Sequence, residues 1–132
     1  DRLLRYLGDA ADGLDFLCQE HDLQHLDVKP GNLLLISDRV KVADFGLIKE
    51  LESNSQSMMS GMTPTYAAPE LFDGRPGRYS DQYSLAIVYQ ELLTGTLPFR
   101  GRTAAQLANE LLHKAPTRRA PCSNPPHTPT AL

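Results

Sequence analysis

The apolar residues of the first twenty positions recur at steps of three and four. They are Leu3, Leu7, Ala10, Leu14 and Leu17. This spacing places them along one stripe of a helix of about 18 residues. The pattern therefore predicts an opening helix that packs this stripe against the rest of the chain.

After this helix the apolar runs become short. Runs at 24–26, 33–36 and 40–43 have the length of strands, not of helices. The polar segment 37–39 supplies turn residues between the last two runs. We therefore expect three short strands, with a turn joining the second to the third.

Two more helices are predicted in the second half. The first runs from Ser80 to Leu93, with Ser80 as N-cap and Gly95 closing it, and it is apolar nearly all round. Such a helix is expected to be deeply buried. The second runs from Thr103 to Lys114. Its residues expected to face inward are Leu107, Leu111 and Leu112.

Two segments lack such patterns. Residues 50–61 are rich in serine and methionine with little periodicity, which predicts a mobile loop. Residues 115–132 contain five prolines, which forbid continuous helix, so a disordered tail is expected there. One folded unit over residues 1–114 remains. Because Asp1 lies directly inside a helical repeat, we expect the chain to be a fragment of a longer polypeptide.

Composition narrows the class of protein. The hydrophobic content of 41% is ordinary for a globular domain, and a net charge of -3 gives no electrostatic reason to expect nucleic acid. No apolar run approaches the roughly 20 residues of a membrane helix. Cys18 and Cys122 lack metal-site spacing and are interpreted as ordinary thiols. We expect a cytoplasmic domain with no membrane segment and no nucleic-acid partner.

Three short motifs point to chemistry. Residues 25–32 read His-Leu-Asp-Val-Lys-Pro-Gly-Asn, residues 44–46 read Asp-Phe-Gly, and residues 68–70 read Ala-Pro-Glu. A lone Asp-Phe-Gly is common and carries little information. The three motifs in this order, the second leaving a strand and the third preceding an apolar helix, are highly specific.

The side chains in these motifs suit phosphoryl transfer, which needs an oriented hydroxyl and metal ions that neutralise a triphosphate. Asp27 can orient the hydroxyl or accept its proton. Asn32 and Asp44 offer the amide and carboxylate oxygens that Mg²⁺ prefers. Lys29 can place an ammonium group beside the transferring phosphate.

From Asp1 to Lys114 the chain resembles the C-terminal lobe of eukaryotic-like serine/threonine protein kinases. The resemblance implies a mainly α kinase-type fold of the α+β kind, with a few short strands around the catalytic loop. It implies ATP and Mg²⁺ as cofactors and protein serine or threonine as substrate. Asp27 would be the catalytic residue, with Lys29 beside it as the serine/threonine form. Asn32 and Asp44 would bind the metal.

Other roles follow from the same resemblance. Thr63 would hydrogen-bond near Asp27 and shape the peptide site. Asp81 would hold the backbone of the catalytic loop, and His25 and Phe45 would stack on each other inside the domain.

The resemblance also extends to the nucleotide and to a later helix. Leu34 would lie under the adenine, with Val88 and Leu92 supporting it. Glu70 would pair with an arginine from a later helix. Neither Arg118 nor Arg119 is a convincing partner, because both lie in the proline-rich tail.

The chain departs from the family at several positions. Leu26 replaces the arginine that in many kinases pairs with a phosphate on the activation loop, so that coupling is not expected here. Met62 stands where glycine is usual.

No Gly-rich loop and no Val-Ala-x-Lys strand occur in these 132 residues. The N-terminal lobe would have to be supplied in cis, and this segment alone is expected to be inactive. Two alternatives stay open: a non-catalytic kinase-like scaffold, and a small-molecule phosphotransferase of kinase-like fold.

Overall fold

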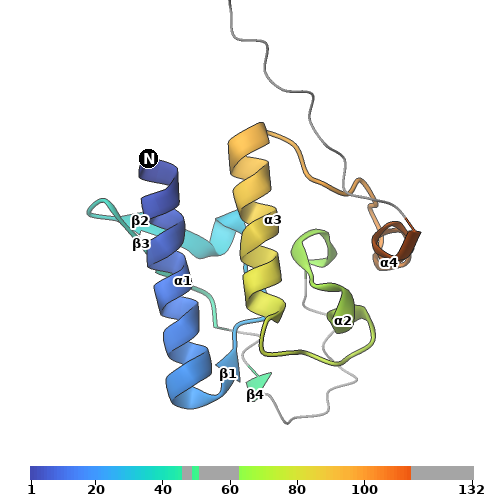
Figure 1. Cartoon of the computed structure of the whole chain (residues 1–132), viewed down its shortest axis with the longest axis horizontal. Coiled ribbons are helices and arrows are strands. Elements are labelled where there is room, and N and C mark those ends of the chain that lie inside the picture. Colours follow the sequence, from blue (N-terminus) through green and yellow to red (C-terminus); the bar gives the residue numbers. More distant parts are fainter. Residues whose placement is uncertain (46–48, 51–62, 114–132) are drawn as a thin grey trace, which may run out of the picture.

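A computed structural model describes residues 1–45, 49–50 and 63–113 of the chain (Figure 1). The described part is mostly helical with a few short strands, as the sequence predicted. Its elements in order are α1 (Arg2–His21), β1 (Leu23–Gln24), η1 (Pro30–Asn32), β2 (Leu33–Ile36), β3 (Arg39–Val42), β4 (Lys49–Glu50), η3 (Pro64–Tyr66), α2 (Pro69–Phe72), α3 (Ser80–Thr94) and α4 (Ala104–His113). Helices α1 and α3 contact each other, and α4 lies beside α2 (Figure 1).

Helix α1 confirms the predicted opening helix. The Asp1 side chain accepts a hydrogen bond from the Leu3 amide at 3.0 Å and caps the N-terminus. The buried residues are Ala10, Leu14 and Cys18, which are four residues apart. Leu17, predicted for this stripe, is only half-buried. The core therefore takes Cys18 in its place.

The hairpin of β2 and β3 confirms the second and third predicted strands. The strands pair antiparallel, with Leu33 opposite Val42 and Leu35 opposite Val40. Ser37 and Asp38 make the turn in the left-handed region, at φ 49° and 61°. Asp and Ser are common at turns, and Asp tolerates this conformation better than most residues.

The first predicted strand is displaced. It was expected at 24–26, but β1 covers Leu23–Gln24, which pair with β4. The backbone amides of His25 and Leu26 donate to the Asp81 side chain on α3, so they do not pair with a neighbouring strand. Glu50, expected to begin the mobile loop, belongs to β4. Residues 51–61 of that loop and the proline-rich tail lie outside the described residues.

Helix α3 ends as predicted, at Gly95 with φ 69°. The expected deep burial of the whole helix is wrong for its last turn. Leu92 and Leu93 are 52% and 56% exposed, whereas Val88 is fully buried. The buried residues of this helix end at Val88, and the residues after it are half-buried or exposed. Among the helices that the structure describes, none is long and apolar enough to cross a membrane.

Helix α4 buries one of its three predicted inward residues. Leu107 is 2% exposed, Leu111 is half-buried, and Leu112 is 76% exposed. The prediction for Leu112 was wrong because five residues rotate a helix by about 140°, which turns Leu112 away from the face of Leu107. The loop before α4 packs closely against the helix at Gly101. A Cβ at this position would lie 2.7 Å from the Leu107 nitrogen, which leaves no room for a side chain.

One carboxylate ties the hairpin to α1. Asp9 accepts a hydrogen bond from the Val40 amide at 3.0 Å and pairs with Arg39 at 2.8 Å. The Val40 amide, and after it the Arg39 guanidinium, lower the pKa of Asp9 below its ordinary value, although desolvation opposes them. A carboxyl whose native pKa is depressed stabilises the fold above its unfolded pKa of about 3.9 and loses this effect as pH falls through the native pKa.

Replacing Asp9 with Asn is therefore expected to lower the melting temperature at pH 7, because the ion pair to Arg39 is lost. The difference from the unchanged chain should shrink as the pH falls below about 4. Thermal melts followed by circular dichroism between pH 7 and pH 2.5 measure this. Asp12→Asn, at an exposed position of the same helix, is the control. A difference that stays constant over this pH range would contradict the role given to the charge.

Candidate active site

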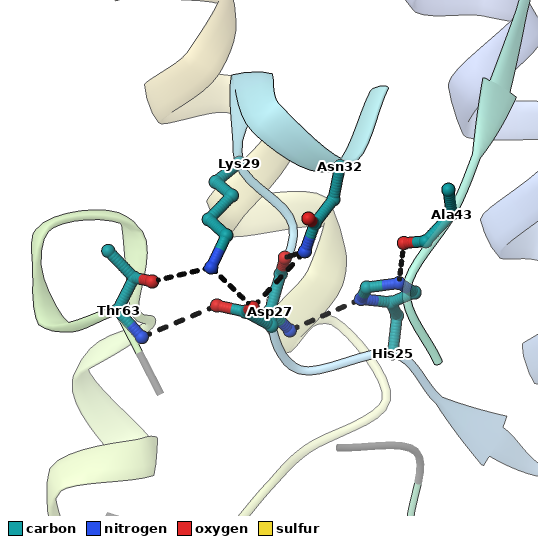
Figure 2. Close-up of polar contacts among 6 residues, drawn as sticks. All are labelled: His25, Asp27, Lys29, Asn32, Ala43 and Thr63. Carbon is teal, nitrogen blue, oxygen red and sulfur yellow. Dashed lines mark hydrogen bonds and ion pairs between the residues drawn. The ribbon is translucent and has the colours of Figure 1, made fainter. Parts of the chain in front are cut away.

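The loop between β1 and β2 brings its polar side chains together around Asp27 (Figure 2). The Lys29 ammonium lies 2.7 Å from Asp27 Oδ2, and the Asn32 side-chain nitrogen donates to the same oxygen at 3.1 Å. The Thr63 amide donates to Asp27 Oδ1 at 3.3 Å. Asp27 is only 8% exposed. Both of its oxygens therefore have partners, which fix the direction of the carboxylate.

Lys29 joins two segments that are distant in sequence. Its ammonium pairs with Asp27 and also donates to Thr63 Oγ1 at 2.9 Å. Thr63 immediately precedes η3, so these contacts hold the start of η3 against the loop. The structure thus brings together Asp27, Lys29 and Thr63, which the sequence grouped around one site.

Asn32 is buried at the end of η1, with its amide turned toward Asp27. Its nitrogen donates to the Asp27 carbonyl oxygen at 2.8 Å as well as to the Asp27 carboxylate. The side-chain oxygen of Asn32 therefore points away from these partners. The backbone oxygen of Asn32 accepts from the Ala43 amide at 2.8 Å, which ties the end of β3 to the loop.

Asp44 follows Ala43, whose amide binds Asn32, and it has a backbone φ of 61°. The left-handed conformation is uncommon for residues other than glycine, although Asp adopts it more readily than most. In the part of the chain that the structure describes, no three His, Cys, Asp or Glu side chains form a metal cluster. The predicted metal site accordingly depends on one amide and one carboxylate, from Asn32 and Asp44.

His25 is fully buried and held in one tautomer. Its Nε2 lies 2.9 Å from the Ala43 carbonyl oxygen and must donate to it, while Nδ1 accepts from the Asp27 amide at 3.3 Å. His25 also meets Phe45, with ring centroids 5.4 Å apart and planes at 62°. The predicted contact is present, but as an edge contact and not as parallel stacking.

Asp81, at the start of α3, reaches under the same loop. Its two carboxylate oxygens accept from the amides of His25 and Leu26, each at 2.7 Å. Burial raises the pKa of Asp81, and the two amide hydrogen bonds oppose that rise. The geometry is the one that the resemblance implies for this residue.

Leu26 has an unusual backbone for a leucine, at φ 64°. This region costs a non-glycine residue about 1–2 kcal/mol, so the surroundings must hold it. The Asp81 carboxylate binds its amide, and its side chain joins an apolar core. That core contains Leu26, Ala67, Ala68 and Leu71, with Phe72 and Tyr83 packed against it. Where a phosphate-binding arginine was absent from the sequence, an apolar contact to residues 67–71 takes its place.

Glu70 joins α2 to α3. Its Oε1 accepts from the Ser80 hydroxyl at 2.6 Å, and the Ser80 oxygen accepts from the Gly77 amide at 2.9 Å. Ser80 is therefore not the N-cap that the sequence predicted; Tyr79 holds that position, without a side-chain cap. Within the described ranges, no arginine forms an ion pair with Glu70.

The apolar residues predicted to meet the adenine are only partly grouped. Leu34 is 45% exposed, and Val88 is buried in α3. Leu92 lines an apolar pocket of about 190 Å³ together with Leu33 and Leu35. Because strand side chains alternate, this pocket lies on the face of β2 opposite to Leu34. Leu92 does not support Leu34 directly.

Sequence reasoning missed one polar contact beside the site. The Tyr66 hydroxyl donates to Glu91 on α3 at 2.8 Å. Burial, together with the Glu91 carboxylate, raises the pKa of Tyr66 to about 12. Tyr66 lies in the Thr-Pro-Thr-Tyr segment, but nothing in the pattern of α3 singled out Glu91.

Comparison with known proteins agrees with this geometry. The model of the protein kinase domain family matches residues 2–129. A protein of Dictyostelium discoideum named as a probable serine/threonine-protein kinase is 36% identical over 106 residues, covering 78% of this chain and 13% of that protein. The chain thus belongs to the protein kinase domain family and spans a small part of the length of this relative. The family match also runs beyond Lys114, where the resemblance of the motifs ended.

Replacing Asp81 with Ala is expected to reduce the free energy of unfolding by about 3 kcal/mol, because two buried amides lose their acceptor. Asp81→Asn keeps one acceptor oxygen, so its free energy of unfolding should lie between those of the unchanged chain and Asp81→Ala. Urea denaturation measures both. Gln82→Ala, at the exposed next residue of α3, is the control. Equal stability of Asp81→Ala and Gln82→Ala would show that the carboxylate does not hold the loop.

Proposed function

We propose that this chain is the C-terminal catalytic lobe of a serine/threonine protein kinase. In the full-length protein it would position a serine or threonine hydroxyl of a protein substrate for attack on the γ-phosphate of ATP. The observation that carries this proposal is the Asp27 carboxylate, fixed on both oxygens by Lys29, Asn32 and Thr63.

The carboxylate of Asp27 gives the substrate hydroxyl a hydrogen-bond acceptor of defined direction. As the hydroxyl oxygen bonds to the γ-phosphorus and the bond from that phosphorus to the ADP oxygen breaks, the hydroxyl proton passes to Asp27. Lys29, 2.7 Å from the same carboxylate, would balance the negative charge that collects at this point.

The donor set suits magnesium, which prefers hard oxygen ligands. Asn32 presents its side-chain oxygen away from Asp27, and Asp44 contributes a carboxylate just after the end of β3. When bound, Mg²⁺ would neutralise charge on the ATP phosphates. These two residues would hold it.

Serine and threonine specificity is supported by the bridge from Lys29 to Thr63. The bridge places η3 beside Asp27, so a substrate chain lying along η3 would bring its hydroxyl to the carboxylate. The lysine two residues after the catalytic aspartate is the form seen in serine/threonine kinases. The name of the Dictyostelium relative points the same way.

The nucleotide requires groups that these residues lack, and the surface supports their supply in cis. Two large apolar side chains on one face of β2 are about half exposed; they are Leu34 and Ile36. Phe45, three residues after β3, is 51% exposed as well. Exposed apolar side chains that gather on one face mark an interaction site in soluble proteins. We propose that an N-terminal lobe covers it. A cytoplasmic location is proposed too, because Cys18 is a free buried thiol.

The full-length protein is expected to phosphorylate a generic protein substrate on serine or threonine with MgATP. Asp27→Asn should lower the rate by about 10³-fold, because the acceptor for the hydroxyl proton is removed. Radiolabelled ATP and phosphoamino-acid analysis measure this. Asp12→Asn is the matched control on the surface of α1.

The same assay separates the alternatives. Transfer to sugars or aminoglycosides in place of protein would indicate a small-molecule phosphotransferase. No transfer at all, with partner binding retained, would indicate a scaffold. The 132-residue segment by itself is expected to be inactive, and transfer by it that disappears in Asp27→Asn would contradict the need for a second lobe.

A further inference from the structure

A groove of about 560 Å³ lies between η3 and the loop that joins α3 to α4. Its walls combine hydroxyl, apolar and basic side chains. They are Thr65 and Thr96, Leu97 and Phe99, and Arg100 and Arg102. None of these residues takes part in the contacts around Asp27 described above.

The groove begins close to the proposed catalytic residues. Thr65 belongs to η3, two residues after Thr63. Thr63 itself contacts both Asp27 and Lys29. A chain that leaves the carboxylate of Asp27 along η3 therefore reaches this groove within a few residues.

The groove has two arginine side chains among the residues that line it. Arg100 and Arg102 are both exposed, and neither forms an ion pair with a carboxylate of the described ranges. Arg5, Arg39 and Arg78 each form one, whereas Arg2 and Arg75 form none in the described ranges. What distinguishes Arg100 and Arg102 is that both line one groove, separated by a single glycine.

An acidic residue of α4 binds the backbone of this loop. Glu110 on α4 accepts from the amides of Arg100 and Gly101, at 2.8 Å and 3.3 Å. This carboxylate fixes the shape of the loop. The loop thereby presents its guanidinium groups to the solvent, and Leu97 and Phe99 give the groove an apolar wall beside them.

We propose that this groove binds an acidic segment of the protein substrate, with one or two carboxylates next to an apolar side chain. The carboxylates would pair with Arg100 and Arg102, since guanidinium binds carboxylate with two parallel hydrogen bonds. The apolar side chain would lie against Phe99. This inference rests on the proposed kinase function, because it names the substrate that the kinase prefers.

The test compares fluorescein-labelled serine peptides that differ at two positions only, Glu-Glu, Gln-Gln or Arg-Arg, beside a leucine. The pair is placed before the serine in one set and after it in another. Fluorescence anisotropy with the 132-residue chain measures their affinities. In one of the sets the Glu peptide should bind about five-fold tighter than the Gln peptide at low salt, with the gap closing as salt rises.

The double variant Arg100→Gln and Arg102→Gln should abolish the preference for Glu. Arg2→Gln, an exposed arginine on the first turn of α1, removes a charge elsewhere and should keep it. Equal affinity of Glu and Gln peptides in both sets, or a preference that survives the double variant, would overturn the inference.

Phosphorylation of the same peptides by the full-length protein separates this inference from the proposed function. Phosphorylation with no preference for Glu would overturn the acidic groove and leave the kinase proposal standing. Charge-dependent binding without phosphorylation of any peptide or protein would leave the groove and overturn the kinase proposal. A higher rate on Glu peptides, lost in the double variant, is the result expected.

Discussion

The buried carboxylate of Asp81 is the constraint on which the rest of the site depends. It binds two consecutive amides, those of His25 and Leu26, and so removes them from the strand that precedes them. The chain then turns at Leu26, in a conformation that leucine rarely adopts, and Asp27 follows at once. One side chain on α3 thus fixes where β1 ends and where the loop that carries Asp27 begins.

Three further side chains of the loop connect it to other segments of the chain. The ring of His25 joins the Asp27 amide to the Ala43 carbonyl, which links the loop to the end of β3. The side chain of Leu26 packs on residues 67–71, and Lys29 binds Thr63. Apolar packing on one side and the Lys29–Thr63 hydrogen bond on the other hold residues 63–71 against the loop that carries Asp27.

The sequence predicted those parts of the fold that depend on neighbouring residues. Helix α1, the β2–β3 hairpin and the end of α3 at Gly95 all arise from local spacing and turn chemistry. The motifs identified the residues that meet around Asp27, since their spacing is tied to their chemistry. Burial was harder to predict, because it depends on which distant segments come to lie on a helix. The apolar last turn of α3 and Leu112 were therefore wrongly expected inside. The polar role of Ser80 toward Glu70 depends in the same way on contacts between two helices.

Amide hydrogen exchange at His25 and Leu26 tests most directly whether Asp81 holds the loop that carries Asp27 in place. NMR or mass spectrometry of the 132-residue chain can follow both amides. Both amides are expected to exchange at least about 100-fold more slowly than in an unstructured peptide, because each is buried and bound to a carboxylate. Exchange of both amides at the unstructured rate, while the amides of α1 stay protected, would contradict the role of Asp81.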